Sequence, residues 1–217
     1  MRQLRDLNWA INSGNFGKLA KGKNPNFFLI DTGVIIDLED NYHDNGKHKE
    51  NMPAVVLSEI EREHNLIITR GVVREIERHA QSMKGNRYEV SSSTSILVQK
   101  IYEDSKICFD ELKLGLDSNL IEEHRYAVVL AAYHAFKFDY RKGVKDTISD
   151  TDKELLCTAL NFSRYTFDDF GCRTVNIIST DNHVLKTINV LKSNNGFQDY
   201  DIRTLNSRGN LKSYLSK

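Results

Sequence analysis

Cysteine is scarce in this sequence, and the few cysteines are far apart. The 217 residues contain three, Cys108, Cys157 and Cys172, and no CxxC pair. An odd number at such spacing argues against both a disulfide framework and a zinc knuckle. We therefore expect reduced thiols and a cytoplasmic location.

Long apolar runs are also missing. No run approaches the roughly 20 residues that a helix needs to span a bilayer. Residues 1–23 lack the apolar centre of a secretory signal, so no membrane association is expected. The composition, 40% hydrophobic and 28% charged, is ordinary for a globular protein of one domain.

The sequence has no excess charge of either sign, because 30 Lys and Arg residues balance 30 Asp and Glu residues. Nucleic-acid-binding proteins often have a basic excess. Any such interaction here must use a local basic patch and not a long-range field. The chain has no Walker loop, no GxGxxG and no HxxxH, so neither a nucleotide cofactor nor a zinc site is supported.

Short apolar runs alternate with helical patterns along the chain. The apolar runs predict buried strands at 27–30, 66–69 and 174–179, and an edge strand at 201–204. Helical spacing predicts helices at 71–81, 93–114, 119–140, 149–163 and 182–191. This alternation predicts an α/β fold whose parallel sheet, of about four strands, is covered by helices on both faces.

We expect one domain from 27 to 205, with a polar extension at 1–26 and a polar tail at 206–217. The helices between about 90 and 145 would elaborate this domain. Within the second of them, six residues recur at helical spacing: Tyr126, Ala127, Val129, Leu130, Ala131 and Tyr133.

Acidic residues follow the predicted strands or open the helices. Asp31 and Asp181 follow strands, Glu75 lies in the helix after the second strand, and Asp150 and Asp152 open a later helix. Because the carboxyl ends of parallel strands share one edge of a sheet, these side chains can converge there. Mg²⁺ and Mn²⁺ prefer carboxylate and water oxygens. Such an ion can generate a nucleophile and neutralise a phosphodiester.

Each of these acids also has a structural interpretation. Asp31 and Asp181 suit turns or helix N-caps, Ser149 and Asp152 have the spacing of a capping box, and Glu75 suits a solvated helix face. For any single acid the structural interpretation is favoured. Capping does not require an acid at every strand end along one edge, so the conjunction of the acids favours a metal site.

Taken in order, four motifs resemble those of the PIN-domain nuclease family. They are Ile30-Asp31-Thr32, Ile68-Thr69 with Val73-Arg74-Glu75-Ile76, Ser149 to Asp152 with Leu155 to Leu160, and Ile178-Ser179-Thr180-Asp181-Asn182. The resemblance extends over most of the chain. It implies a PIN-like three-layer α/β/α fold and metal-dependent hydrolysis of RNA, or of single-stranded or branched nucleic acid.

The resemblance also implies roles for individual residues. The family's acidic positions, which bind Mg²⁺ or Mn²⁺ and carry out catalysis, are matched by Asp31, Glu75, Asp152 and Asp181. Additional candidate ligands are Asp150 and Asn182, and supporting hydroxyl residues are Thr32, Ser149 and Thr180. Asp152 has the family's spacing to the following apolar run, whereas Asp150 does not.

Two positions depart from the family pattern. Arg70-Gly71 stands where many members have a proline, and Asn182 stands where an additional acid often occurs. The segment from about 81 to 148 is longer than in compact toxin members, which argues against the toxin assignment.

Basic residues near the acids are candidates for binding nucleic-acid phosphates: Arg70, Arg74, Arg78 and Lys186. A solvated helix face explains them about equally well. Two alternatives to a general nuclease stay open. One is an inactive PIN-like module that binds RNA or protein, and the other is a toxin ribonuclease controlled by a protein inhibitor. A homo-oligomer is compatible with each, and retention of all four acids favours an enzyme.

Overall fold

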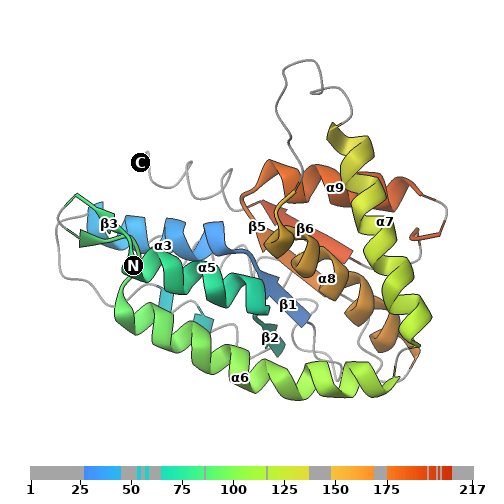
Figure 1. The fold of residues 1–217 in the computed structure, drawn as a ribbon, viewed down its shortest axis with the longest axis horizontal. Helices are drawn as coiled ribbons and strands as arrows, with labels where there is room; N and C mark the ends of the chain where they lie inside the picture. The colour runs from blue at the N-terminus through green and yellow to red at the C-terminus, as the bar shows by residue number, and fades with distance from the viewer. Residues whose placement is uncertain are drawn as a thin grey trace, which may run out of the picture.

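A parallel β-sheet forms the centre of the structure (Figure 1). The computed structural model describes residues 27–44, 53–54, 57–58, 65–85, 87–115, 117–136, 148–168, 175–194, 196–198, 200 and 202–206. The strands have the order β2-β1-β5-β6 and comprise β1 (Phe27–Ile30), β2 (Asn65–Ile67), β5 (Val175–Ser179) and β6 (Ile202–Asn206). All their pairings are parallel, which confirms the predicted α/β class.

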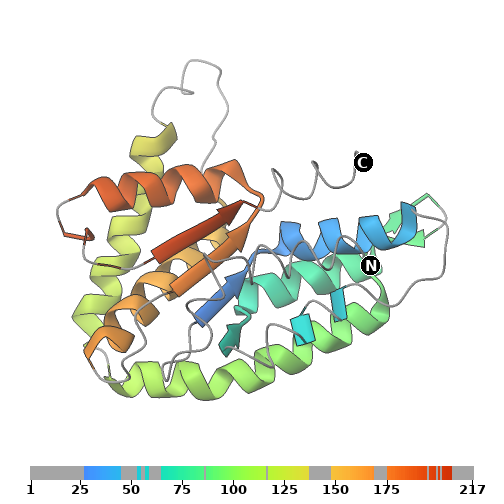
Figure 2. The same ribbon diagram turned by 180° about the vertical axis from the view of Figure 1, so that it is seen from behind.

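Helices follow the strands and lie on either side of β1 (Figures 1 and 2). The helices that directly follow strands are α3 (Thr32–Asp44), α5 (Arg70–Gln81) and α9 (Asn182–Ser193). The others are α6 (Ser92–Gly115), α7 (Ser118–Phe136) and α8 (Asp150–Asp168). Within the described residues, none of these helices is both long and apolar enough to cross a bilayer.

Alternate strand residues enter two separate hydrophobic cores, one on each face of the sheet. Phe28 and Ile30 pack in a core with α3, α5 and α6, whereas Leu29 packs in a core with α7, α8 and α9. Successive residues of a strand point to opposite faces, so a strand between two cores needs apolar residues on both faces. This explains the continuous apolar run at 27–30.

Helix α7 buries the side that carries its small residues and exposes the side that carries its large apolar residues. The residues that enter the core are mostly small: Ala127, Val128, Ala131, Ala132 and Phe136. Four large residues are exposed instead: Tyr126, Val129, Leu130 and Tyr133. The helical spacing predicts the helix correctly, but the pattern combines residues from two sides. Alanines face inward because α7 packs closely against α8 and α9.

A short hairpin joins α5 to α6, and no pattern in the sequence predicts it. It consists of β3 (Met83–Lys84) and β4 (Arg87–Tyr88), paired antiparallel. Gly85 in its turn has a φ of 66°, a conformation that glycine adopts without steric cost.

The N-terminus of α5 approaches α8 closely at Gly71. The N–H groups of Arg70 and Gly71 donate hydrogen bonds to the two carboxylate oxygens of Glu154, at 3.1 and 2.9 Å. A Cβ atom at Gly71 would lie 2.8 Å from Glu154 Oε2 and 3.0 Å from the Cα atom of Thr151. A proline at this position would also lose the second hydrogen bond, because it has no N–H. Glycine therefore fits this contact better than either alanine or proline.

Gly71→Ala should lower the free energy of unfolding by roughly 1–2 kcal/mol, because the overpacking cost exceeds the helix preference of alanine. Urea denaturation measures this change. Gly196→Ala is the control, since no atom lies within 4 Å of a Cβ there, and it should change stability by less than about 0.5 kcal/mol. Equal stability of Gly71→Ala and the parent would mean that Thr151 and Glu154 move aside without cost.

Candidate functional site

Four carboxylates lie at the edge of the sheet where the strands end. Asp31 stands between β1 and α3, and Asp181 follows β5 and caps α9. Asp152 lies in the first turn of α8, and Glu75 lies on α5. Asp31 and Asp152 are buried, with 5% and 7% of their surface exposed, whereas Glu75 and Asp181 are partly buried.

The charges of these four residues act on one another. The pKa of Asp31 is raised to about 6: burial is the largest cause, a hydrogen bond from Ser179 opposes it, and the charges of Asp152, Asp181 and Glu75 add to it. Burial likewise raises the pKa of Asp152, with contributions from Asp181 and Glu75. The structure therefore places the four acids near enough for their charges to act on one another.

Hydroxyl groups from the strand ends hold two of the carboxylates. Thr32 Oγ1 donates to Glu75 Oε2 at 2.7 Å, and Ser179 Oγ donates to Asp31 Oδ2 at 2.6 Å. Ser179 Oγ also accepts a hydrogen bond from the N–H of Asp181 at 3.0 Å, so it links two acids. Thr32, which was expected to support the site, contacts Glu75 through its hydroxyl. Ser179 was missed, and its only signal was a small hydroxyl at the end of a buried strand.

The other two carboxylates take part in the capping of their helices. Ser149 and Asp152 form a capping box, in which the N–H of each donates to the side chain of the other at 3.0 Å. Asp181 Oδ1 accepts from the N–H of His183 at 2.6 Å and lies 3.0 Å from its Nδ1. The structural interpretation of these acids is therefore correct, and it coexists with their membership of the cluster.

No lysine or arginine side chain pairs with these four carboxylates within the described residues; the one ion-pair partner there is the His183 ring beside Asp181. In the same part of the chain, no three His, Cys, Asp or Glu side chains are placed to hold one metal ion together. The charges of the four acids thus act on one another, but no three of these side chains are placed to coordinate one ion.

The remaining predicted residues lie around the cluster. Asp150 has a side chain that is 97% exposed, and its pairing with Lys153 at 2.8 Å lowers its pKa. Asp150 therefore lies outside the cluster, as does the exposed Asn182 at the start of α9. Thr180 is buried beside Gly33, whose added Cβ would lie 3.0 Å from Thr180 Oγ1.

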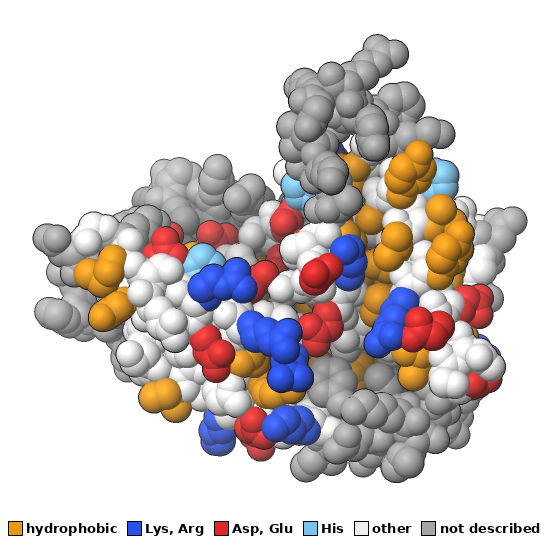
Figure 3. Space-filling model, viewed as in Figure 1, with side chains coloured by type: hydrophobic (Ala, Val, Ile, Leu, Met, Phe, Trp, Pro, Cys, Tyr) orange, Lys and Arg blue, Asp and Glu red, His pale blue; other side chains and the backbone are white. Residues whose placement is uncertain are grey.

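The four candidate phosphate-binding residues are all exposed: Arg70, Arg74, Arg78 and Lys186. Lys186 lies over the ring of Phe136, with its Nζ 5.7 Å from the centroid. Figure 3 shows Lys and Arg side chains over α5 and the start of α8, with acidic side chains among them. Basic and acidic groups thus share one face of the molecule.

Asp31→Asn should stabilise the metal-free protein near neutral pH. The pKa of about 6 in the folded state exceeds the ordinary value of 3.8. The native state therefore binds more protons between these values, and the stability contribution of Asp31 falls as pH rises through this window. Asparagine carries no charge and avoids this cost, so we expect a gain of roughly 1–3 kcal/mol near pH 7 that fades toward about pH 4.

Urea denaturation in EDTA across this pH range tests the expectation. Asp150→Asn is the matched control, because its carboxylate is exposed and its charge is favoured by Lys153. It should give no gain at any pH. An Asp31→Asn protein that is less stable than the parent near pH 7 would show that Asp31 acts mainly as a structural acceptor for Ser179.

Comparison with known proteins gives no match to this chain. No protein family, no curated protein and no solved structure matches it.

Proposed function

We propose that the protein is a PIN-type nuclease that uses Mg²⁺ or Mn²⁺ to hydrolyse phosphodiester bonds in RNA. The observation that carries this proposal is the proximity of four carboxylates from separate segments: burial raises the pKa of Asp31, and the charges of the other three acids add to this effect. Like charges held together reduce the stability of the empty site. A bound cation would relieve this repulsion and so stabilise the folded protein. The alternative role, helix capping, explains only Asp152 and Asp181.

The donor chemistry of the cluster suits a hard divalent cation, because all four groups offer carboxylate oxygens. As the described side chains stand, no three of them converge on one point. Cation binding therefore requires changes of side-chain rotamer. Glu75 and Asp181 are less buried than Asp31 and Asp152 and have more freedom for such changes. A bound ion would activate water and neutralise the phosphate.

Three hydroxyl residues would set the positions of the carboxylates during the reaction. The hydroxyl of Thr32 donates to Glu75, the hydroxyl of Ser179 donates to Asp31, and the backbone N–H of Ser149 donates to the Asp152 carboxylate. In hydrolysis, the oxygen of water bonds to phosphorus, the bond to the leaving oxygen breaks, and the water proton passes to a base.

RNA is proposed as the substrate because the motifs resemble those of PIN nucleases and because exposed arginines lie on the helix that carries Glu75. Purified protein should cleave labelled single-stranded RNA when Mn²⁺ or Mg²⁺ is added and should not cleave it in EDTA. The same ions should raise its melting temperature. Cleavage of DNA but not RNA would correct the substrate, and neither cleavage nor a melting shift would remove the basis for the proposal.

Asp152→Asn should slow cleavage by on the order of 100-fold or more, because it removes one buried charge from the cluster. Asp150→Asn should leave the rate near that of the parent, since its exposed carboxylate pairs with Lys153. The two variants carry the same substitution at positions two residues apart on one helix. Initial rates in Mn²⁺ at saturating RNA compare them, and similar rates for both would place the reaction elsewhere.

A further inference from the structure

Three arginines form a row along α5. Arg70, Arg74 and Arg78 are exposed, and no ion pair of their side chains occurs within the described part of the chain. They recur every four residues, which corresponds to a rise of about 6 Å along an α-helix. This is close to the spacing of consecutive phosphates in an extended single strand, so one backbone can contact all three.

The row is held in a fixed position beside the acidic cluster. Glu75 follows Arg74 directly and stands three residues before Arg78 on the same helix. The hydrogen bonds from the N-terminus of α5 to Glu154 join this helix to α8, which carries Asp152. A strand that follows the arginines would therefore run along the helix that carries Glu75.

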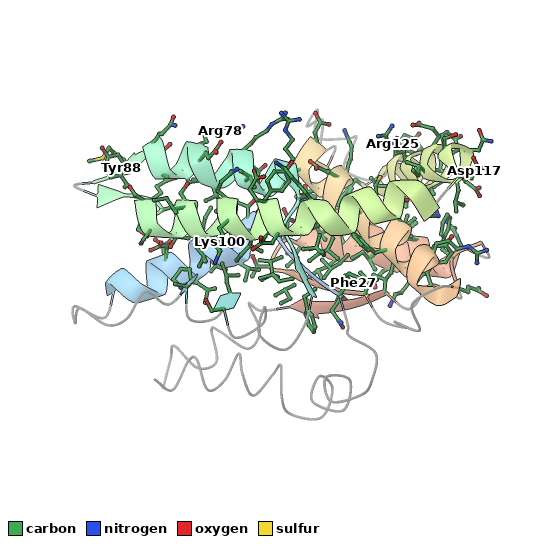
Figure 4. All side chains as sticks on the ribbon, turned by 90° about the horizontal axis from the view of Figure 1, so that it is seen from below. Phe27, Arg78, Tyr88, Lys100, Asp117 and Arg125 are labelled. Carbon is green, nitrogen blue, oxygen red and sulfur yellow. The ribbon has the colours of Figure 1, made fainter. Side chains whose placement is uncertain are left out.

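An exposed aromatic residue stands beyond the end of the row. Tyr88 is 54% exposed on the hairpin that follows α5, and its cross-strand neighbour Met83 is 58% exposed. Figure 4 shows Arg78 and Tyr88 on the same side of the molecule, with Lys100 lower down. Aromatic side chains bind single strands by stacking on the bases, which a duplex keeps within its own stack.

We propose that Arg70, Arg74 and Arg78 bind successive phosphates of a single-stranded nucleic acid, and that Tyr88 stacks on one of its bases. This inference rests on the proposed nuclease function and adds the form of the substrate and its path. A single row of cations matches one backbone, whereas a duplex presents two. The net charge of zero also requires such a local site.

Fluorescence anisotropy with a labelled single-stranded RNA, in EDTA at several salt concentrations, tests the proposal. Each arginine-to-alanine substitution should reduce the slope of log K against log salt by about 0.7, and the triple variant should reduce it by about 2. Tyr88→Ala should weaken binding about tenfold with an unchanged slope, and Tyr88→Phe should restore it. Arg125→Ala on α7, which removes an exposed arginine that pairs with Glu122, is the control and should change neither.

A duplex of the same sequence is the comparison ligand, and it should bind more weakly and be insensitive to Tyr88→Ala. An unchanged salt slope in the triple variant would overturn the phosphate row. Equal losses for single strand and duplex would overturn the single-strand assignment. Because binding is measured in EDTA without cleavage, an inactive protein that still binds through the row would refute the nuclease proposal alone.

Discussion

The register between β1 and β5 determines where the acidic cluster forms. Ile30 lies opposite Ile178, and the N–H of Asp31 continues the ladder by donating to the carbonyl of Ile178 at 3.0 Å. This places Asp31 beside Ser179, whose hydroxyl also contacts the backbone of Asp181. A slip of one residue would turn Asp31 to the other face of the sheet. The two apolar cores prevent this slip, because it would exchange the residues that each core receives.

The same edge is also where helices begin, and their N-termini partly offset the negative charge. Asp31 precedes α3, Asp152 lies in the first turn of α8, and Asp181 caps α9. The N-terminus of a helix carries a partial positive charge that favours a nearby carboxylate. The pKa values of Asp31 and Asp152 are nevertheless raised, first by burial and then by the charges of the neighbouring acids. The fold thus supports the acids without neutralising them.

The positions of Asp31 and Asp181 could be predicted from the sequence because both follow parallel strands, which end at one edge of the sheet. Asp152 and Glu75 lie on helices, so this rule alone does not place them. The contacts around the acids depend on register and side-chain direction, which sequence spacing does not reveal. Ser179, the residue before Thr180, donates a hydrogen bond to Asp31 for this reason. The sequence also does not reveal which side of α7 is buried, because close helix packing buries its alanines while Tyr126 is exposed. The hairpin at 83–88 has strands too short for any pattern.

The arginines of α5 and the carboxylates of the cluster would have opposite effects on a bound phosphate, so the two proposals are linked energetically. Under these proposals, the carboxylates would repel a phosphate that the arginines of α5 attract when no cation is bound. A cation that neutralises the cluster would remove this repulsion and strengthen the binding of the strand. Thermodynamic linkage is reciprocal, and the strand must strengthen cation binding by the same factor. In a chain whose net charge is zero, no long-range field competes with this local coupling. Substrate and cation would therefore assemble the site together, each supplying the charge that the other lacks.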